Sequence, residues 1–309
     1  KMENTMKESA ATILVNSCDA YEDAWYPFFE LLKKYWVDCN YPIVLNTESK
    51  IYKDDVLNLK CFGLYSPGKR VTYGQRMIQH LKRIPSDFII MMMDDFFLRS
   101  PVDNEKIAFY IDYMKKNGNV AYISFDAVKD SYNIDDISLN ECVLRPRCGE
   151  YKVNLQAGIW RKEKLLSCIR SHESPWEFET KGSIRSFEMQ DKFYTMKDIS
   201  LSPIDYGKRP GLTWGIVRGK WVKEDVVPLF EKNNIIVNTQ YRGYFNKSDF
   251  EDITIQKGGL IRDIKSYGIS LVIQMKRWHI ERFIRKMMHL QYDVDWVAYK
   301  RRKEQENHE

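Results

Sequence analysis

Two adjacent carboxylates, Asp94 and Asp95, directly follow a run of six apolar residues at 88–93. A run without polar alternation predicts a strand that is buried on both faces, and ligands of open α/β sheets bind at the carboxyl ends of such strands. Neighbouring acids repel one another there unless a positive charge lies between them, and a divalent cation bound to phosphate meets that need. We therefore expect the pair to hold a metal ion. The alternative is that one acid caps the next turn while the other is solvated.

The elements that would position this pair follow one another as strand, helix, strand, strand, helix, strand. Apolar runs and helical spacing place strands at 11–18, 41–46, 59–64 and 88–93 and helices at 21–36 and 72–84. Short loops between such elements are typical of a doubly wound sheet with helices on both faces. The expected fold class is therefore α/β, with one Rossmann-like, mostly parallel central sheet.

The rest of the chain is expected to continue this pattern. The expected elements are a helix at 104–116, strands at 120–125 and 154–160, a helix at 162–171, a helix beginning at 174, a short helix at 187–194 and a late strand at 199–205. The stretch 126–149 between them is polar and irregular. The segment 207–220 is rich in Gly, Arg and Lys, which indicates a flexible basic segment of the kind that closes over phosphates.

Polar residues also end the first expected strand. Asn16 and Ser17 stand there, and Arg76 lies on the helix that precedes the acids. Because the carboxyl ends of parallel strands meet at one edge, we expect Asn16 and Ser17 to contact a base or ribose. Arg76 is expected to reach toward the phosphates of the same nucleotide. The alternative for each of them is an ordinary surface or capping residue.

The composition argues against several classes of protein. A formal charge of +5 on 309 residues, without a dense basic stripe, argues against a nucleic-acid binder. The six cysteines show neither a C-x-x-C pair nor a zinc spacing, as expected of reduced thiols. No segment has the roughly 18 to 20 apolar residues that span a bilayer, and residues 1–10 are too charged for a signal peptide. A cytoplasmic location is expected.

The last stretch, 266–309, has the character of a helical appendage to a main domain at 1–265. Within 271–290, five basic residues stand against one acid. Four apolar residues share one side of the expected helix there: Ile280, Phe283, Ile284 and Met287. Two interpretations remain open. Either the apolar side packs on the main domain, or the helix lies on an anionic membrane at its inner face.

Two blocks of the sequence resemble a known family. The apolar strand with its terminal acids, placed after a helix, resembles the Asp-x-Asp region of GT-A class nucleotide-sugar glycosyltransferases, of the type that builds bacterial glycans, polysaccharides and lipopolysaccharide. The block Asn-Leu-Gln-Ala-Gly-Ile-Trp at 154–160, followed by Ser-Pro-Trp-Glu-Phe-Glu at 174–179, resembles the acceptor-side region of the same class. The resemblance covers about residues 11–222.

This resemblance implies a GT-A-like fold, a nucleotide-sugar donor, and a glycan or lipid-linked acceptor. It also implies a divalent metal, Mn²⁺ or Mg²⁺, at Asp94 and Asp95. The sequence departs from the class in two places. The second acid of the motif usually stands two positions after the first, whereas position 96 is Phe. The class also commonly adds a late histidine to the metal, and His279 and His289 here fall on the expected tail helix.

Transfer from a nucleotide-sugar leaves negative charge on the departing diphosphate, which a cation or basic side chains must stabilise. Without a metal, the resemblance implies that basic residues do this work, as they are thought to do in metal-free members of the class. The candidates are Arg218 and Lys220, with Lys208 and Arg209 in the same basic segment.

If the sugar is transferred with inversion, which we expect, the acceptor hydroxyl needs a general base. The resemblance places a catalytic carboxylate at 174–179, where the candidates are Glu177 and Glu179. Glu177 is preferred because it follows Trp176, a platform that can stack on a sugar ring. The alternative is that both acids only stabilise the N-terminus of a helix.

Two other functions remain as alternatives. Sugar-1-phosphate nucleotidyltransferases use a similar sheet, but they need a glycine-rich loop after the first strand, and residues 16–21 contain no glycine. The second alternative is a non-catalytic carbohydrate-binding or scaffold protein with the same sheet. The missing acid at position 96 is the feature that favours it.

Overall fold

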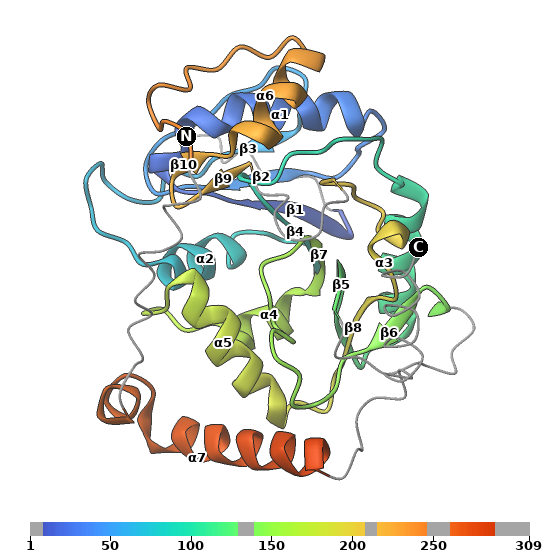
Figure 1. The fold of residues 1–309 in the computed structure, drawn as a ribbon, viewed down its shortest axis with the longest axis vertical. Helices are drawn as coiled ribbons and strands as arrows, with labels where there is room; N and C mark the ends of the chain where they lie inside the picture. Colours follow the sequence, from blue (N-terminus) through green and yellow to red (C-terminus); the bar gives the residue numbers. More distant parts are fainter. Residues whose placement is uncertain (1–8, 129–138, 208–214, 246–259, 288–309) are drawn as a thin grey trace, which may run out of the picture.

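A mixed sheet of eight strands carries the fold (Figure 1). The computed structural model describes residues 9–128, 139–207, 215–245 and 260–287. The strands of the sheet are β1 (Ala11–Asn16), β2 (Ile43–Asn46), β3 (Leu59–Lys60), β4 (Phe88–Met93), β5 (Val120–Ala127), β6 (Cys142–Leu144), β7 (Gly158–Arg161) and β8 (Lys192–Met196). Their order across the sheet is β3-β2-β1-β4-β7-β5-β8-β6.

Parallel pairing dominates the half of the sheet around β1. Asn16 at the end of β1 stands opposite both Asn46 and Met93, because β2 and β4 are parallel to β1. β7 runs antiparallel between β4 and β5, and its first residue, Gly158, is paired with Met91 and with Ser124. Four of the seven pairings are parallel and three are antiparallel. The expected α/β fold with a mostly parallel central sheet is confirmed.

Helices lie on both faces of this sheet (Figure 1). The described α-helices are α1 (Glu22–Tyr35), α2 (Tyr73–Leu81), α3 (Asn104–Lys116), α4 (Lys162–Cys168), α5 (Pro175–Arg185), α6 (Lys223–Lys232) and α7 (Leu260–Met287). Short 3-10 turns are η1 (Asp19–Tyr21), η3 (Ser186–Glu188) and η4 (Ile199–Leu201). α1, α3 and α6 share one hydrophobic core with the sheet, whereas α2, α4 and α5 share a second.

β4 contributes side chains to both cores, which explains why its sequence does not alternate. Ile90 and Met92 pack into the core that contains α1 and α3. Ile89 and Met91 point the other way, into the core that contains α2 and α4. Successive side chains of a strand point to opposite faces, so a strand between two layers of helices must be apolar at every position. This is the burial that the run at 88–93 predicted.

Two of the expected elements are wrong. The segment expected as a short helix at 187–194 forms the turn η3 and then the strand β8, which fills the sheet between β5 and β6. Short apolar runs fit a strand as well as a helix, and pairing with β5 decides the matter here. The strand expected at 199–205 begins instead with the turn η4, where the carboxylate of Asp198 accepts a hydrogen bond from Ser200 N at 2.8 Å. Local capping of this kind competes with sheet formation.

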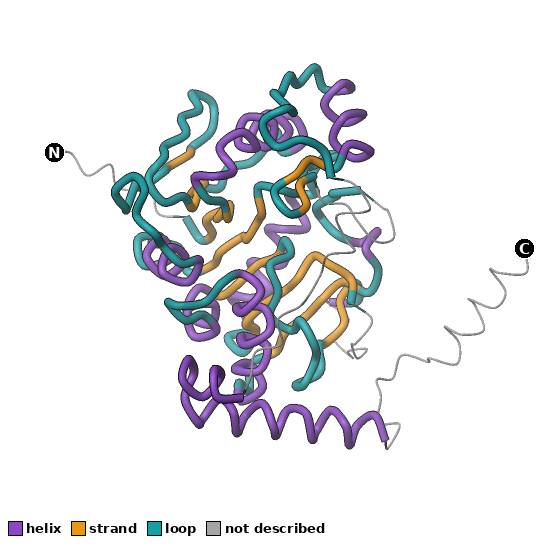
Figure 2. Tube along the Cα trace, turned by 60° about the vertical axis from the view of Figure 1, so that its left-hand side comes forward, coloured by secondary structure: helices purple, strands orange, loops and turns teal. Residues whose placement is uncertain are grey.

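α7 lies along one side of the molecule, next to α5 and away from the sheet (Figure 2). It begins at Leu260, earlier than the expected appendage, and Gly268 interrupts it with a φ of 78°. Leu271 and Trp278 pack from α7 against Ile184 and Phe187. None of the described helices is long and apolar enough to cross a bilayer. Residues 288–309 of the expected appendage lie outside the described residues.

Candidate active site

The acid pair lies where β1 and β4 end side by side. Asn16 O, at the end of β1, accepts a hydrogen bond from Asp94 N at 3.2 Å, so the parallel ladder continues to the first acid. Gly158 of β7 is paired with Met91, two residues before the end of β4. The loop that enters β7 therefore lies at the same edge. This edge gathers the ends of β1, β4 and β5 with the start of β7, as the strand pattern predicted.

Asp94 is buried and tied into a short chain of hydrogen bonds. Its Oδ2 accepts a hydrogen bond from the hydroxyl of Ser17, and that hydroxyl oxygen in turn accepts one from Trp25 Nε1 at 2.6 Å. Burial, and then the neighbouring charge of Asp95, raise the pKa of Asp94 well above its ordinary value. Ser17 and Trp25 thus hold the Asp94 carboxylate in one orientation, although this side chain is costly to ionise.

Asp95 is half-buried, and one of its oxygens lacks a partner. Its Oδ1 is shielded from solvent and has no hydrogen-bond partner among the described residues. Burial raises the pKa of Asp95 to about 7, and the positive charge of Arg242 opposes that rise. A shielded carboxylate oxygen of this kind is costly unless a cation meets it. Asp95 is therefore the side chain at this edge that most needs a positively charged ligand.

Arg242 is a site residue that the sequence did not reveal. Its Nε donates to Asp23 Oδ2 at 2.7 Å, and its guanidinium lies 4.2 Å from the ring centre of Tyr21. Its charge opposes the rise that burial causes in the pKa of both Asp94 and Asp95. Arg242 and Asp23 are 219 residues apart, so no local pattern could have indicated the pairing.

Two buried asparagines line the same edge next to the acids. Asn46 Nδ2 donates to Asn16 Oδ1 at 3.0 Å, so each amide fixes the other. Asn16 Nδ2 and Asn46 Oδ1 remain shielded and without partners among the described residues. One spare donor and one spare acceptor, side by side, are the groups that recognise the edge of a base or a ribose hydroxyl. Asn16 and Ser17 both lie where the sequence placed them.

Arg76 is near this edge but is already neutralised. It is buried on α2, and one of its guanidinium nitrogens is ion-paired with Glu48. Glu48 also accepts a hydrogen bond from Asp19 N at 2.6 Å, so the pair connects α2 to the loops after β1 and β2. A Thr72–Gln75 capping box fixes the start of α2. The expected phosphate contact of Arg76 stays a prediction, and the contacts seen here position loops.

His80, one turn beyond Arg76, provides a test of this helix by pH. Burial, and the nearby arginines, lower the pKa of His80 to about 4, whereas an unfolded histidine has a pKa of about 6.5. Between these values the unfolded chain binds a proton that the folded chain does not, so stability falls as the pH drops from about 6.5 to 4. The shift corresponds to about 3 kcal/mol. The His80→Phe variant is expected to lose this dependence in urea unfolding measured across that range.

The exposed His279 on α7 supplies the control for this experiment. His279→Gln is expected to keep the pH dependence of the wild type, because the substitution leaves the buried His80 ring and its surroundings unchanged. A pH dependence that survives in His80→Phe would show that other groups cause it.

The basic residues Arg218 and Lys220 belong to a two-stranded hairpin beside the acids, formed by β9 (Ile216–Val217) and β10 (Lys220–Trp221). Gly215 N, just before β9, donates to Asp95 O at 2.7 Å. A Cβ at Gly215 would stand only 2.1 Å from the Phe97 ring, so this approach requires glycine. Arg218 is exposed in the turn. The hairpin therefore lies next to Asp95 in space. Lys208 and Arg209 lie outside the described residues.

The two candidate catalytic glutamates lie on the first turns of α5 and have different surroundings. Glu177 accepts a hydrogen bond from Ser174 N at 3.0 Å and completes a capping box. Glu179 Oε1 accepts one from Leu155 N at 2.9 Å, in the loop that enters β7, and burial raises the pKa of Glu179. Glu177 therefore has the capping role that was its alternative interpretation. Glu179 is held by the loop that enters β7. Trp176, between the cap residue Ser174 and Glu177, is 74% exposed.

Asp126 is a third carboxylate at this edge and was missed. It lies near the end of β5, and Ala127 N donates to its Oδ1 at 2.8 Å. Burial raises the pKa of Asp126, and Arg145 opposes that rise. The signal was the same as for Asp94, namely an acid at the carboxyl end of an apolar strand.

The two carboxylates of the acid pair could supply only some of the ligands that a divalent ion needs. Among the residues that the structure describes, no group of three or more His, Cys, Asp or Glu side chains is placed to hold a metal. Two adjacent carboxylates, one with an unmet buried oxygen, suit an ion such as Mg²⁺ that takes its other ligands from phosphate and water. His279 lies on α7, and His289 lies outside the described residues.

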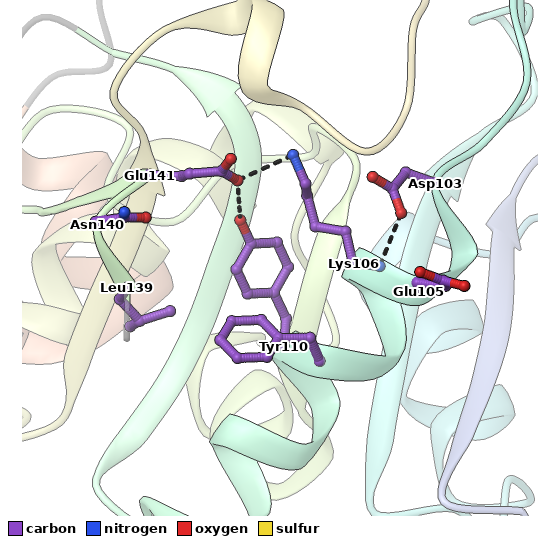
Figure 3. Close-up of a pocket in the computed structure, with 8 residues that line it drawn as sticks. Asp103, Glu105, Lys106, Tyr110, Leu139, Asn140 and Glu141 are labelled. Carbon is purple, nitrogen blue, oxygen red and sulfur yellow. Dashed lines mark hydrogen bonds and ion pairs between the residues drawn. The ribbon is translucent and has the colours of Figure 1, made fainter. Parts of the chain in front are cut away.

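A pocket of about 470 Å³ lies elsewhere, between α3 and the residues that precede β6 (Figure 3). Two of its charged groups, Lys106 and Glu141, pair with each other. Lys106 Nζ lies 2.9 Å from Glu141 Oε2, and Tyr110 OH donates to the same oxygen at 3.3 Å. Mutually paired side chains need no bound ligand, in contrast to Asp95.

No protein-family model matches the sequence, and no curated protein matches it. Solved structures similar in fold include TarS from S. aureus, with a TM-score of 0.40 and 12% identity over 61% of this chain and 36% of TarS. Mannosyltransferase PcManGT from Pyrobaculum calidifontis, in complex with GDP-Man and Mn²⁺, has a TM-score of 0.36 and 11% identity over 60% of this chain and 54% of its own. A cytidylyltransferase from Leptospira borgpetersenii has a TM-score of 0.35 and 15% identity over 56% of this chain and 68% of its own.

The chain spans 36% of TarS and 60% of the TarS structure of residues 1–349. At TM-scores of 0.40 and below, these likenesses carry no argument about function. The α/β architecture itself rests on the strand order and pairing of the sheet.

Proposed function

We propose that the protein is a hexosyltransferase-like glycosyltransferase, which moves a sugar from a nucleotide-sugar donor to a glycan or lipid-linked acceptor. The observation that supports this most is the acid pair at the carboxyl edge of β4, where Asp95 keeps a shielded oxygen without a partner. Beside it, Asn16 and Asn46 have a spare amide donor and acceptor. A site that lacks a cation next to spare base-reading groups suits a nucleoside diphosphate with its counter-ion.

Asp94 and Asp95 are proposed to hold a divalent ion, Mn²⁺ or Mg²⁺, which when bound stabilises the negative charge of the leaving diphosphate. Ser17 positions Asp94 through its hydrogen bond, and Asn16 is proposed to contact the base or ribose. Arg218 and Lys220 are proposed to approach the diphosphate from the hairpin beside Asp95. Arg76 keeps a proposed role at the phosphates, although its present contacts are to Glu48.

The proposed general base is Glu179, with Asp126 as the second candidate. Burial raises the pKa of each above its ordinary value, toward the range in which a carboxylate accepts a proton efficiently at neutral pH. The base takes the proton of the acceptor hydroxyl while that oxygen bonds to the anomeric carbon and the nucleoside diphosphate leaves, with inversion. Glu177 remains a candidate, but its carboxylate already accepts the hydrogen bonds of the α5 cap.

A lipid-linked acceptor also has a consequence for where the protein works. A cytoplasmic protein with a lipid-linked acceptor would work at the inner face of the membrane. Residues 271–290 are proposed as the contact with an anionic surface. The division into a catalytic domain at 1–265 and an appendage at 266–309 is part of the same proposal.

A thermal-unfolding panel with UDP, GDP, CDP and CMP, each with and without Mn²⁺, tests the proposed function. A ligand at 100 times its dissociation constant adds about 2.7 kcal/mol of stability, which raises the melting temperature by several degrees. One nucleotide is expected to give this shift, more strongly with Mn²⁺, and the shift is expected to disappear in Asp95→Ala. A shift of the melting temperature that is the same with and without Mn²⁺ would indicate that Arg218 and Lys220, instead of a metal, bind the diphosphate. No shift with any nucleotide would contradict the proposal and favour a non-catalytic carbohydrate-binding protein.

A further inference from the structure

α7 is apolar on two opposite sides. Leu271 and Trp278, seven residues apart and therefore on one side of the helix, are buried against Ile184 and Phe187. Ile273 and Ile280 each follow one of these residues by two positions, which turns them about 200° around the axis. The inner side thus holds α7 to the α5 region, and a second apolar side faces away from it.

The outward side carries exposed apolar side chains before and after Lys276 and Arg277, and these apolar side chains are called the outer stripe below. Its members are 45–67% exposed: Ile269, Ile273, Ile280, Phe283 and Ile284. Isolated exposed apolar residues are ordinary, but several large ones on one side of a helix mark an interaction surface. The sequence left open whether this apolar side packs on the main domain. Ile280, Phe283 and Ile284 are exposed and do not pack on it.

The charges around the outer stripe indicate what it contacts. Lys276 and Arg277 are exposed and stand between Ile273 and Ile280 in the sequence. Residues 269–287 contain five basic residues and a single acid, Glu281. Arg277 Nη1 lies 2.8 Å from Glu188 Oε1, and Arg282 Nη2 lies 3.1 Å from Glu150 Oε2, so these two basic residues are paired with acids outside α7. Lys276 is exposed within the stripe. An apolar stripe with a basic border is complementary to the headgroups and upper acyl chains of anionic lipid.

A second copy of the chain fits this surface less well. A two-fold dimer through the outer stripe would place the same patch on both subunits, and Lys276 would then meet the basic residues of the other copy. Like charges across an interface weaken association, whereas an anionic bilayer attracts them.

We propose that the outer stripe of α7 docks on an anionic lipid bilayer while its inner side stays packed on the α5 region. The protein then rests on the membrane in one fixed orientation instead of hanging from a tether. This inference rests on the membrane contact proposed above for residues 271–290 and specifies its surface. Its failure can be distinguished from failure of the proposed glycosyl transfer, since binding to vesicles is measured without turnover.

Co-sedimentation with vesicles of phosphatidylcholine, with or without one quarter phosphatidylglycerol, tests the surface. The full chain is expected to bind the anionic vesicles. The variant Ile280→Gln/Ile284→Gln is expected to lose at least about tenfold in partitioning, because it removes two large apolar side chains from the stripe. Lys276→Glu is expected to weaken binding about tenfold on anionic vesicles and to leave binding to neutral vesicles unchanged. Ile236→Gln, at an exposed isoleucine outside α7, serves as the matched control.

Fluorescence with brominated anionic lipid tests the fixed orientation. The variant Phe283→Trp is expected to add emission, above that of the wild-type chain, that brominated lipid quenches. The proposal would be overturned if the variant Ile280→Gln/Ile284→Gln bound anionic vesicles as tightly as the wild type does. A dimer mass near twice 36.8 kDa, reduced to a monomer by the same variant and without vesicle binding, would assign the stripe to a second copy instead.

Discussion

Replacing Asp95 with alanine is expected to lower the turnover of a nucleotide-sugar by about 10² to 10³-fold, the loss typical when one preorganised charge-stabilising group is removed. The reason lies in the Asp95 carboxylate, whose shielded oxygen lacks a partner and whose pKa is raised by burial. In the proposed site it contacts the cation that balances the departing diphosphate. The measurement is release of nucleoside diphosphate from the donor that the unfolding panel identifies.

Stability measurements separate this loss from unfolding. Asp95→Asn keeps the size of the side chain and removes a half-buried negative charge, so its melting temperature is expected to equal or exceed that of the wild type while turnover still falls. Asp55→Ala, at an exposed acid of the loop between β2 and β3, is expected to change neither quantity. Turnover within threefold of the wild type in Asp95→Asn would exclude Asp95 from the chemistry.

Replacing Arg185 with alanine is expected to reduce the free energy of unfolding by about 3 to 5 kcal/mol. Arg185 Nη2 donates to Glu173 Oε2 at 2.8 Å, Nη1 lies 2.8 Å from Oε1 as an ion pair, and both side chains are buried. Arg185 Nε also donates to Cys168 O at 3.0 Å, and Glu173 accepts from Arg170 N at 2.8 Å. Without the arginine, a buried carboxylate would keep its desolvation cost but lose its counter-charge.

Urea unfolding of the variants measures this effect. Arg185→Lys is expected to lose less than Arg185→Ala, because an ammonium keeps the charge but cannot make the two-pronged contact. Arg83→Ala, at an exposed arginine just after α2, is the control and is expected to stay within about 0.5 kcal/mol of the wild type. A loss below about 1 kcal/mol in Arg185→Ala would show that the pair is solvated in solution.

The Arg185–Glu173 pair also affects how α5 is positioned. Glu173 O accepts a hydrogen bond from Gly74 N at 3.0 Å, so the loop before α5 is tied to the start of α2. A Cβ at Gly74 would stand 1.9 Å from Arg170 O, and only glycine permits the approach. The ion pair therefore helps to hold α5, which carries Glu179, next to the start of α2.

The parts of this structure that local patterns predict are those in which burial is decided locally. Five of the six apolar residues of β4 are buried, on both faces of the strand, and Met93 is partly buried. The acids that follow them lie at the sheet edge as expected. The end of β1 is similar, with Asn16 and Ser17 in place beside Asp94. In these stretches the residue types alone indicate a strand that is covered on both faces and that ends in polar residues.

Other features depend on partners that are remote in the sequence. Arg242 becomes a site residue through Asp23 and the field of the acid pair, neither of which its own surroundings indicate. β8 is a strand because it pairs with β5 and β6, although its apolar run is too short to distinguish a strand from a helix. The periodicity of α7 likewise found an apolar side but could not say which side packs on the domain. The catalytic assignments of Glu177 and Glu179 stay predictions.

The position of bound Mn²⁺ tests the central claim most directly. In crystals grown with Mn²⁺ and the nucleoside diphosphate that stabilises the protein, anomalous scattering locates the metal without ambiguity. The account predicts a metal peak within roughly 2.0 to 2.6 Å of an Asp95 oxygen, the range of hard divalent cations, with the diphosphate as a further ligand and the base beside Asn16. A nucleotide bound elsewhere, for example in the pocket at Glu141, with no density at Asp95, would contradict it.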